Sequence, residues 1–484
     1  MERKMKICVL QPDYSTTGVD YKHYDPPREL SSLLPDHTVD HIFLNKLTTY
    51  KQLLELSKNQ YDCFVNLCEG YLEWEVPSID VIHSLDLLNL PYTGPNVHTY
   101  DPPKELMKYV AYTEGVQTSP YALIRPGMDI YKEIEHLIFP LFVKPAKAGD
   151  SLGIDDDSMV KDAASLEQKC KHLLEAYPEL IIENYINGRE FTVLVAADAA
   201  NPKLPKVYPP VEYIFPDGKF FKTYSLKTSE LHPSSNVVVE DPNIIDALSD
   251  AARKIFNSFG GTGYARLDFR MDDKGVLYFL EINFTCSVFY SDGYEGSADY
   301  ILNADEDGAA GFLLYIIQDG IARYEKKQKK YMMKGNAISG YGIYAKRDIS
   351  RGEIIFKGEE QPHRLITKKW MEQHWTEQEK RLFSQYALPI SAEVYIIWDE
   401  EPTSWAPQNH SCRPNTIYEG LNVIALRNIE AGEELTLDYS HLLDEHAESF
   451  ACNCGSPQCK KKITGSTENS FTAKEMLRRK LFHD

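Results

Sequence analysis

The amino-acid sequence predicts a multidomain protein in which a long α/β part is followed by a shorter all-β part. Its 484 residues are enough for two to four domains, each with its own hydrophobic core. Up to about residue 320, short β-branched or aromatic runs alternate with longer mixed segments, a pattern typical of α/β proteins. Residues 335–440 instead resemble many short strands separated by turns. The lysine-rich stretch 325–330 lies between the two patterns, and we place a domain boundary there.

Short apolar runs are expected to form the strands of the α/β part. They lie at Lys6–Leu10, Tyr61–Leu67, Leu141–Lys144, Leu180–Glu183, Thr192–Ala196 and Leu277–Asn283. Glycine- and proline-rich stretches at 91–95 and 260–263 indicate turns. The sequence contains no internal repeat and no low-complexity tract.

Composition and charge argue against several classes of function. The chain has 52 Lys and Arg against 72 Asp and Glu, a formal net charge of −20, which argues against nonspecific binding of nucleic acid. No run approaches the roughly 18 apolar residues of a membrane span. The apolar run Lys6–Leu10 is not followed by a secretory cleavage site. We therefore expect an intracellular protein, cytoplasmic or, in a eukaryote, nuclear, with no membrane partner.

The nine cysteines fall into two groups. Five stand singly in the first 300 residues, and four cluster near the C-terminus, at Cys412, Cys452, Cys454 and Cys459. This distribution fits a reducing compartment with one metal site better than a disulfide framework. Four thiolates suit tetrahedral Zn²⁺ and leave no position for a water molecule, so we expect a structural zinc ion. Four reduced, buried thiols are the alternative.

Carboxylates in the α/β part have a spacing that suits a magnesium site. Asp268 lies in the run 266–269, and Glu281 and Asn283 lie in the run 279–283. On two adjacent antiparallel strands, these three side chains would present oxygen atoms to one point. Hard oxygen ligands suit Mg²⁺ held between a protein and nucleotide phosphates. A solvated sheet edge is the alternative explanation of the acidic pair.

Several motifs follow one another in a fixed order in the first 300 residues. The run 142–146 (Phe-Val-Lys-Pro-Ala) precedes a loop at 149–153, and Ile182–Glu190 follows after a gap of helix length. Leu90–Gly94 and Lys104 extend the pattern towards the N-terminus. In order and spacing these motifs resemble the ATP-grasp fold, specifically its D-alanine–D-alanine ligase branch.

The resemblance implies a set of ATP-binding residues and a reaction. Three lysines would grip the phosphates and two glutamates would hold the adenine and the ribose, at Lys104, Lys144, Lys227, Glu183 and Glu190. Arg266 would be catalytic, because it would stabilise charge on the transferred phosphoryl group. The magnesium ligands would be Asp268, Glu281 and Asn283. The implied reaction turns a carboxylate and ATP into an acyl phosphate, which an amine then attacks to give an amide.

The chain departs from the ligases on the substrate side. The stretch 11–18 lacks their Gly-Gly-x-Ser loop, Asp150 replaces the first serine of a Gly-Ser-Ser loop, and Thr228 replaces a tyrosine. Cys286-Ser287 stands where the family has Pro-Gly. We therefore expect ligation of a small-molecule or peptide carboxylate to an amine, with substrates other than D-alanine. A non-catalytic nucleotide- or substrate-binding module is the alternative.

Three further motifs accompany the cysteine cluster. They are 339–345 (Ser-Gly-Tyr-Gly-Ile-Tyr-Ala), Asn409–Asn415 and Gly432–Tyr439. With the Cys-x-Cys-x4-Cys run behind them, they resemble the SET-domain protein methyltransferases that carry a post-SET zinc lobe. The resemblance implies methyl transfer from S-adenosylmethionine to a lysine of a protein or peptide. It also implies that Cys412 joins the three later cysteines on the zinc ion.

This second resemblance also implies cofactor-binding and catalytic residues. Those that would bind the cofactor are Gly340, Tyr341, Gly342, Asn409, His410 and Tyr439. Tyr439 would also be catalytic, because a phenol oxygen can orient the methyl group for an in-line displacement at sulfur. A buried core tyrosine is the alternative for Tyr439. His410 is expected to pack and hydrogen-bond rather than to bind metal.

Other features bear on the methyl acceptor. Leu437 stands where many relatives have Phe or Tyr, which leaves the number of methyl groups added open. The segment 355–405 matches the histone enzymes poorly, so a histone tail is one candidate substrate among several. Either a substrate channel or the core would contain Tyr395, Trp398 and Trp405. A degenerate SET unit that only binds proteins is a further alternative, against which the presence of the cofactor and catalytic residues argues.

The predicted fold class is therefore multidomain α/β plus all-β, with an ATP-grasp fold followed by a SET-domain β-fold and a zinc-bound post-SET lobe. The expected domains are an N-terminal α/β domain, an ATP-grasp nucleotide-binding domain, a linker, a SET domain, a post-SET zinc lobe and a tail, at 1–118, 119–322, 323–334, 335–442, 443–465 and 466–484. The expected cofactors are S-adenosylmethionine, ATP, Mg²⁺ and Zn²⁺.

Overall fold

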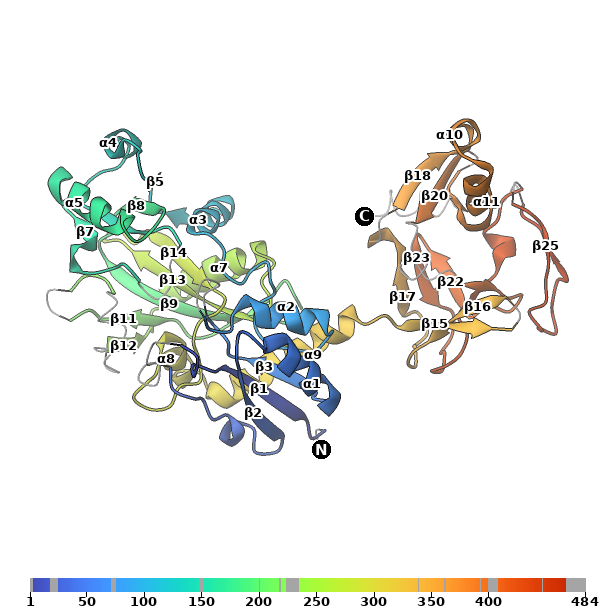
Figure 1. The fold of residues 1–484 in the computed structure, drawn as a ribbon, viewed down its shortest axis with the longest axis horizontal. Coiled ribbons are helices and arrows are strands. Elements are labelled where there is room, and N and C mark those ends of the chain that lie inside the picture. The colour runs from blue at the N-terminus through green and yellow to red at the C-terminus, as the bar shows by residue number, and fades with distance from the viewer. Residues whose placement is uncertain are drawn as a thin grey trace. The chain divides into compact units, whose positions relative to one another are not determined.

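The computed structural model divides the chain into two compact units, Met1–Lys327 and Gln328–Asp484 (Figure 1). It describes residues 3–17, 25–70, 75–147, 152–199, 201–216, 219–222, 235–337, 339–360, 363–391, 393–398, 408–445 and 447–466. The division falls inside the segment predicted as a linker. Of that segment, residues 323–327 end a long helix and residues 331–334 begin a strand, so little of it is irregular.

The first unit begins with a parallel sheet of order β2-β1-β3. Its strands and the helices that pack on it are β1 (Lys6–Pro12), β2 (Thr38–Leu44), β3 (Cys63–Asn66), α1 (Thr49–Leu56), α2 (Ile79–Leu87) and α9 (Gly308–Lys327). Successive side chains of a strand point to opposite faces. Ile7 and Val9 pack with residues of α9, whereas Cys8 and Leu10 pack with residues of α1 and α2. The sheet is therefore covered on both faces, which explains why residues 7–10 of β1 are all apolar.

A seven-stranded sheet forms the centre of the first unit, with order β12-β11-β9-β13-β14-β4 and β10 beside β9. Its strands are β4 (Gln117–Thr118), β9 (Arg189–Ala196), β10 (Lys206–Val207), β11 (Val211–Tyr213), β12 (Asn236–Val238), β13 (Tyr264–Met271) and β14 (Leu277–Asn283). Helices of this part are α3 (Lys104–Thr113), α7 (Pro242–Ser258) and α8 (Ser297–Asn303). Leu267 and Phe269 of β13 pack in a core with α7. The residues that alternate with them, Arg266, Asp268 and Arg270, therefore face the opposite side of the sheet.

A four-stranded sheet of order β5-β8-β6-β7 completes the first unit. Its elements are β5 (Tyr121–Ile124), β6 (Leu141–Pro145), β7 (Met159–Val160), β8 (Leu180–Asn184), α4 (Ile130–Glu133) and α5 (Ala163–Leu174). Leu166, Cys170 and Leu173 of α5 pack against Val143 and Ile182 of the sheet. The other face of this sheet is left to line a cleft, described below.

The six apolar runs predicted as strands all form strands. The predicted run Leu277–Asn283 coincides with β14, whereas β3 is shorter than the predicted run Tyr61–Leu67. The two predicted turns pack on each other. Both Gly94 and Gly263 have positive φ angles, and a Cβ atom on Gly263 would lie 2.3 Å from the backbone of Gly94. No larger residue fits at Gly263 without a backbone shift.

The second unit consists mainly of short strands in small sheets. Its strands are β15 (Tyr331–Asn336), β16 (Gly340–Ala345), β17 (Ile354–Lys357), β18 (His363–Thr367), β19 (Leu388–Pro389), β20 (Val394–Trp398), β21 (Asn409–His410), β22 (Thr416–Glu419), β23 (Asn422–Ala425), β24 (Thr436–Leu437), β25 (Phe450–Ala451) and β26 (Lys462–Ile463). The pairings are β15-β16, β17-β23-β22, β18-β20-β19, β25-β26 and the parallel pair β21-β24.

The second unit also contains two helices within the segment expected to be all-β. They are α10 (Lys368–His374) and α11 (Glu377–Tyr386). Each begins with a threonine whose hydroxyl accepts a backbone hydrogen bond, Thr367 for α10 and Thr376 for α11. Thr376 and Glu379 form a reciprocal capping box. Capping therefore starts helices where the hydrophobic pattern is too weak to predict them.

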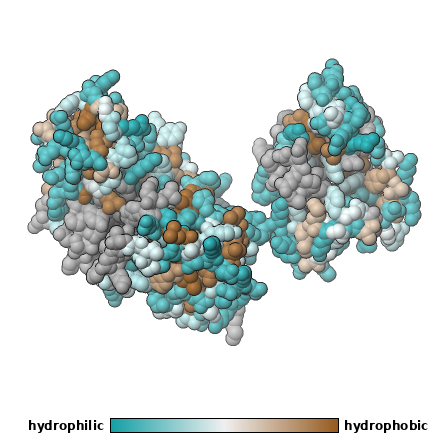
Figure 2. Space-filling model, viewed as in Figure 1, coloured by the Kyte–Doolittle hydropathy of each residue, from teal (hydrophilic) through white to brown (hydrophobic). Residues whose placement is uncertain are grey.

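The surface of each unit is mostly polar where it is visible. On the face shown in Figure 2, hydrophilic residues cover much of the coloured surface and hydrophobic residues form smaller patches. Within the described ranges, no helix combines the length and the apolar character needed to cross a membrane.

Candidate functional sites

A charged cleft lies between the four-stranded and seven-stranded sheets of the first unit. Most of the residues predicted to handle ATP and magnesium line it, namely Lys104, Lys144, Glu183, Glu190, Arg266, Asp268 and Glu281. They come from α3 and from strands β6, β8, β9, β13 and β14. Lys227, also predicted, lies outside the described residues, as do Asp150 and Thr228.

Glu183 lies between two lysines at the base of this cleft. Its carboxylate is 2.6 Å from Nζ of Lys144 and 2.7 Å from Nζ of Lys108, and all three side chains are buried. Burial alone would raise the pKa of the Glu183 carboxyl, but the two ammonium groups lower it to about 2. Lys108 was not predicted from the sequence. Its position four residues after Lys104 on α3, one helical turn along the same face, is the signal that could have found it.

Glu190 is paired with two further cations that the sequence analysis missed. Its carboxylate lies 2.9 Å from the guanidinium of Arg270 and 3.3 Å from Nζ of Lys222. Arg270 also donates 2.8 Å to the carbonyl of Ile186 and so ties the segment between β8 and β9 to β13. The period-two alternation of β13 places Arg270 on the face of Arg266 and could have indicated it. Nothing in the pattern singles out Lys222.

The predicted magnesium ligands lie on neighbouring strands. Asp268 on β13 is directly opposite Glu281 on β14, and Arg266 is opposite Asn283. Arg266 donates 3.1 Å to Asp268, and Lys104 lies 2.7 Å from Glu281. Burial would raise the pKa of Asp268, but Arg266 and then Lys222 lower it. The Asp268 carboxylate therefore stays ionised and is available to a divalent cation.

Asn283 is held differently from the two carboxylates. Its Oδ1 accepts hydrogen bonds from the backbone nitrogen of Thr285 at 2.9 Å and from the Thr285 hydroxyl at 3.2 Å. One side-chain oxygen of the predicted metal set is thus already used by the loop that follows β14. Two carboxylates are fewer than a protein-only magnesium cage needs, but they suit an ion that phosphates also bind.

The cleft has the chemistry of a site for a nucleotide polyphosphate. Six cationic side chains line or underlie it against four carboxylates, so its net charge is positive. Another part of its wall is apolar and aromatic, with Phe142, Tyr185, Phe221 and Leu280. The rings of Phe142 and Phe221 are 5.0 Å apart, centre to centre, in an edge-to-face arrangement. A planar base would suit the aromatic part, and a polyanion would suit the cationic part.

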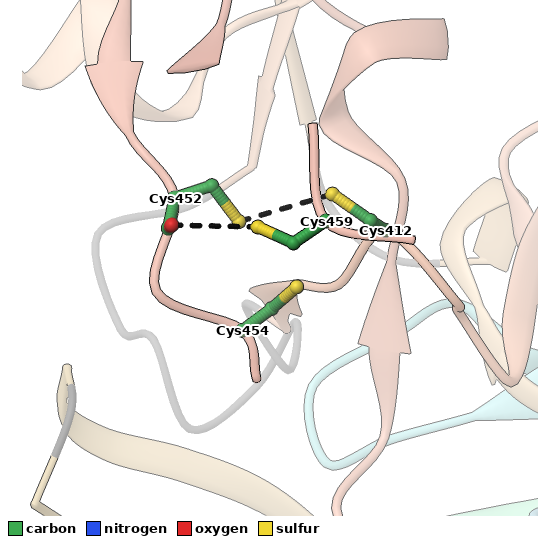
Figure 3. Close-up of side chains that lie close together, drawn as sticks. All are labelled: Cys412, Cys452, Cys454 and Cys459. Carbon is green, nitrogen blue, oxygen red and sulfur yellow. Dashed lines mark hydrogen bonds between the residues drawn. The ribbon is translucent and has the colours of Figure 1, made fainter. Parts of the chain in front are cut away.

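In the second unit, the four clustered cysteines point into one space, as Figure 3 shows. The sulfur atoms of Cys412, Cys452, Cys454 and Cys459 all lie within 4.8 Å of one another. The Sγ atoms of Cys412 and Cys452 are 3.8 Å apart. A tetrahedron with zinc–sulfur bonds of about 2.3 Å has sulfur–sulfur edges of about 3.8 Å. The donor set and its spacing therefore fit Zn²⁺. Among the described residues, no other group of three or more His, Cys, Asp or Glu side chains has such spacing.

Backbone hydrogen bonds reach the cysteine sulfurs, although burial raises the pKa of the Cys412 and Cys452 thiols. Backbone nitrogens of Lys460 and Lys461 donate to the sulfurs of Cys412 at 3.3 Å and Cys459 at 3.4 Å. Burial would raise the pKa of the Cys454 thiol, but backbone hydrogen bonds lower it to about 6. Donors of this kind orient and stabilise the ligands of a metal site. None of the nine cysteines forms a disulfide.

A hydrogen-bonded network joins the three motifs predicted to bind a cofactor. The Nδ2 of Asn409 donates 2.6 Å to the carbonyl of Tyr341 and 2.8 Å to a carboxylate oxygen of Glu434. Asn336 donates 3.0 Å to the same carboxylate. A Cβ atom on Gly342 would lie 2.3 Å from Glu434. The second glycine of the Gly-x-Gly pair is therefore required by the Glu434 carboxylate, which the sequence analysis did not predict as a site residue.

Tyr439 and His410 lie beside this network. The Tyr439 hydroxyl donates to the carbonyl of Gln408, and its backbone nitrogen donates 3.1 Å to Nδ1 of His410. Nδ1 of His410 is thus an acceptor, which places the proton of a neutral ring on Nε2, 3.2 Å from the Cys412 sulfur. Burial, followed by nearby tyrosines, raises the pKa of Tyr439 well above its usual range. The phenol is neutral, and His410 packs and hydrogen-bonds next to the cysteine cluster.

Lys460 connects the cysteine cluster to the residue that precedes Tyr439. Its backbone nitrogen donates to Cys412, and its ammonium lies 3.0 Å from the carboxylate of Asp438. Asp438 also accepts from the backbone and the hydroxyl of Ser440. The predicted Tyr395 and Trp398 are buried on β20, and Trp405 lies outside the described residues.

Two family descriptions match this chain. Residues 112–288 match the family described as "D-ala D-ala ligase C-terminus", and residues 340–440 match the family described as "SET domain". The first match covers the four-stranded sheet and most of the charged cleft. The second runs from β16 through Tyr439.

Individual proteins similar to this chain divide in the same way. A D-alanine–D-alanine ligase of Dechloromonas aromatica is 31% identical over 202 residues, which are 41% of this chain and 64% of that protein. A variant-silencing SET domain-containing protein of Plasmodium falciparum is 30% identical over 172 residues, 32% of this chain and 7% of that protein. The chain therefore spans less than two thirds of the length of either relative.

Among solved structures, a D-alanine–D-alanine ligase from Bacillus anthracis complexed with ATP is 20% identical, with a TM-score of 0.47, over 67% of this chain and 100% of that one. The two family matches occupy separate stretches and leave the residues between them unassigned. The chain is thus a fusion of an ATP-grasp unit of the D-alanine–D-alanine ligase type, matched at residues 112–288, with a SET domain at residues 340–440.

Proposed function

We propose that the second unit is a protein-lysine N-methyltransferase that uses S-adenosylmethionine. The observation that carries this proposal is the network of Asn409, Tyr341 and Glu434 next to the neutral, half-buried Tyr439. When bound, S-adenosylmethionine supplies a methyl group on a positively charged sulfur. Because Nδ2 of Asn409 already makes two hydrogen bonds, its Oδ1 is oriented to accept one from the ammonium of such a cofactor.

Tyr439 would position the reacting groups. Its phenol donates its proton to the Gln408 carbonyl, so the oxygen lone pairs remain to accept contacts from the methyl group and the amine. A free lysine amine has a pKa of about 10.4 and must be neutral to react. The raised pKa of Tyr439 keeps a negative charge away from the amine, and such a charge would favour the unreactive ammonium form.

The four cysteines would hold one structural zinc ion. Four protein ligands fill a tetrahedral site, so no position remains for water or substrate. The role of the ion would be to fix Cys412, next to His410, together with the segment 452–459.

We further infer that the first unit binds ATP with magnesium and ligates a carboxylate to an amine. Lys104 and Lys144 would contact the phosphates, Glu183 and Glu190 the nucleoside side, and Asp268 with Glu281 the metal. Lys222, rather than Lys227, is the described lysine that reaches Glu190 and acts on Asp268. The substitutions on the substrate side favour a second candidate, a nucleotide- or substrate-binding module without turnover.

The methyltransferase proposal is tested with radiolabelled S-adenosylmethionine and panels of purified proteins and lysine peptides. The full chain should label at least one acceptor, and Tyr439→Phe should lower labelling about a hundredfold or more while cofactor binding changes little. Tyr331→Phe, at a buried tyrosine of β15 outside the matched motifs, is the control. Equal labelling by wild type and Tyr439→Phe would contradict the catalytic assignment.

The ligase proposal is tested by ATP turnover with panels of carboxylates and amines. Phosphate release that depends on both substrates and is lost in Lys144→Ala supports a ligase. Tight ATP binding, also lost in Lys144→Ala but without turnover on any pair, supports the binding module instead. No ATP binding would contradict both.

A further inference from the structure

A buried hydroxyl group lies next to the predicted magnesium ligands of the first unit. Thr192 is 1% exposed, and its Oγ1 has no hydrogen-bond partner in the part of the chain that the structure describes. A buried polar group that is left without a partner costs about 1–3 kcal/mol. Most buried hydroxyls in native proteins are paired, so the neighbours of this one indicate what could pair with it.

Thr192 lies on the side of β9 that is turned towards the charged cleft. Phe191 and Val193 pack in the core with α7, so the residues that alternate with them point to the other side of the sheet. Glu190, on that other side, lines the cleft. Directly opposite Thr192 on the antiparallel strand β13 is Asp268. The Cβ atoms of such opposite residues are about 4.5–5.5 Å apart, so a rotation about χ1 is enough to bring the hydroxyl to the carboxylate.

In the structure, one guanidinium holds both oxygens of Asp268. Nε of Arg266 donates 3.3 Å to Oδ1, and Nη2 of Arg266 donates 3.1 Å to Oδ2. With a nucleotide bound, the two residues would have different roles, because Asp268 would bind the metal and Arg266 would stabilise the transferred phosphoryl group. A divalent cation and a guanidinium on one carboxylate repel each other, so this pair should separate when ATP and Mg²⁺ bind. Asp268 then loses the two hydrogen bonds that orient it here.

We propose that Thr192 is a positioning residue of the magnesium site, and that its hydroxyl donates to Asp268 once Arg266 turns towards the phosphates. The inference rests on the proposed binding of ATP with magnesium. Thr192 would touch neither the nucleotide nor the metal. Its hydroxyl would hold one oxygen of the carboxylate, which leaves the other oxygen facing the cleft. Hydrogen bonds of this kind orient metal ligands, and the loss of one typically lowers metal affinity about 10- to 100-fold.

The test measures ATP binding to the full chain by calorimetry while the Mg²⁺ concentration is varied. Thr192→Val replaces the hydroxyl with a methyl group of similar shape. It should raise the Mg²⁺ concentration needed for half-maximal tightening of ATP binding about tenfold or more, and leave metal-free ATP binding unchanged. Thr192→Ser keeps a hydroxyl and should restore the wild-type Mg²⁺ dependence. An unchanged Mg²⁺ dependence in Thr192→Val overturns the inference, as does an equal shift in Thr192→Ser.

Urea unfolding of the full chain separates this role from a structural one. Because the hydroxyl has no partner in the unliganded protein, Thr192→Val should be at least as stable as wild type. A Thr192→Val protein that is clearly less stable would show that the hydroxyl supports the fold, and would overturn the inference. Thr49→Val is the matched control, at a buried threonine of α1 whose hydroxyl donates 3.1 Å to the carbonyl of Asn45. It should keep the wild-type Mg²⁺ dependence.

The wild-type protein distinguishes failure of the inference from failure of the proposed function. If it binds no ATP, the proposed nucleotide site is wrong. If it binds ATP equally well with and without Mg²⁺, the proposed magnesium site is wrong, and the role of Thr192 falls with it. If Mg²⁺ tightens ATP binding equally in wild type and in Thr192→Val, only the role of Thr192 is wrong.

Discussion

At the scale of single residues, Glu434 illustrates how one carboxylate shapes a cofactor site. It accepts from Asn336 and Asn409, and its oxygen occupies the space that a side chain at residue 342 would need. A single charge therefore explains both the orientation of Asn409 and the glycine of the Gly-Tyr-Gly motif. The sequence contains Glu434 in a recognisable motif, but no pattern shows that its carboxylate faces Gly342.

Glu434→Gln should weaken binding of S-adenosylmethionine. The glutamine amide would present a donor to an amide donor of Asn336 or Asn409, and a lost hydrogen bond to a charged group costs about 1.5–3 kcal/mol. The dissociation constant measured by calorimetry should rise about tenfold or more. Glu430→Gln, on the exposed turn nearby, is the matched control and should bind normally. Normal binding by Glu434→Gln would show that Asn409 needs no such support.

The rate of methyl transfer should rise with pH up to pH 9 and should not fall anywhere in that range. Below the pKa of the substrate amine, about 10.4, each pH unit increases the neutral fraction about tenfold. Burial raises the pKa of Tyr439, so its phenol stays protonated over the same range. Initial rates at subsaturating peptide, with cofactor binding measured in parallel, check this. A decline between pH 7 and 9 would indicate that a group other than the substrate amine controls the rate.

At the scale of elements, strands were predictable and the helices of the SET unit were not. The apolar run Leu277–Asn283 indicates the strand, but its period does not give the functional face, because Phe279 and Ile282 pack in the core with α7 while the neighbours Leu280 and Glu281 both line the cleft. The pairing of Asp268 with Glu281 depends on a register shift between Asp268 and Phe269, because the register next to the turn, with Phe269 opposite Phe279, would place Asp268 opposite Leu280. By contrast, α11 buries Phe383 but is otherwise mostly polar, and its capping box was the usable clue.

The site of the first unit was predictable only as far as its motif residues. Lys144 and Glu183 lie in motifs, whereas the only signal for Lys108 is its position one helical turn after Lys104, and no pattern indicates Lys222. Lys108 matters because it joins α3 to β8 through a buried ion pair. That position suggests that Lys108 shares a face with Lys104, but it does not show that Glu183 is the partner.

Lys108→Met should destabilise the first unit by about 3 kcal/mol, because it leaves the buried carboxylate of Glu183 without one of its two counter-charges. Urea unfolding of the full chain, monitored by the loss of ATP binding, measures this change in stability. Lys254→Met removes an exposed ion pair with Asp250 and should cause no measurable change. The pKa of Glu183, lowered to about 2 from 4.5, adds a pH dependence. Its stabilisation is complete above pH 4.5 and is lost as the pH falls towards 2. Equal stability of Lys108→Met and wild type would contradict the ion-pair argument.

At the scale of the whole molecule, the chain combines two units whose proposed chemistries need different ions. Asp268 and Glu281 present hard oxygen ligands, whereas the four clustered cysteines present soft sulfur ligands. Because the two donor sets lie in separate compact units, each metal can be removed or replaced without altering the donor set of the other.

Removing zinc should therefore abolish the activity of one unit only. Elemental analysis should find one zinc ion per chain, and a zinc-selective chelator, with Mg²⁺ kept in excess, should abolish binding of S-adenosylmethionine while ATP binding persists. Cys412→Ser should lose the ion, whereas Cys170→Ser, at a buried cysteine of α5, should keep it. A protein with full S-adenosylmethionine binding and no zinc would show that the four thiols are only packed together.

The position of Lys460 gives this metal a consequence beyond the stability of its own lobe. The backbone nitrogen of Lys460 donates to Cys412, a proposed zinc ligand, and its ammonium pairs with the carboxylate of Asp438, the residue before the proposed catalytic Tyr439. Molecules made while zinc is scarce would fold their first unit normally yet lack a formed methyl-transfer centre. The supply of zinc in the cell would then determine what fraction of the protein can modify its targets.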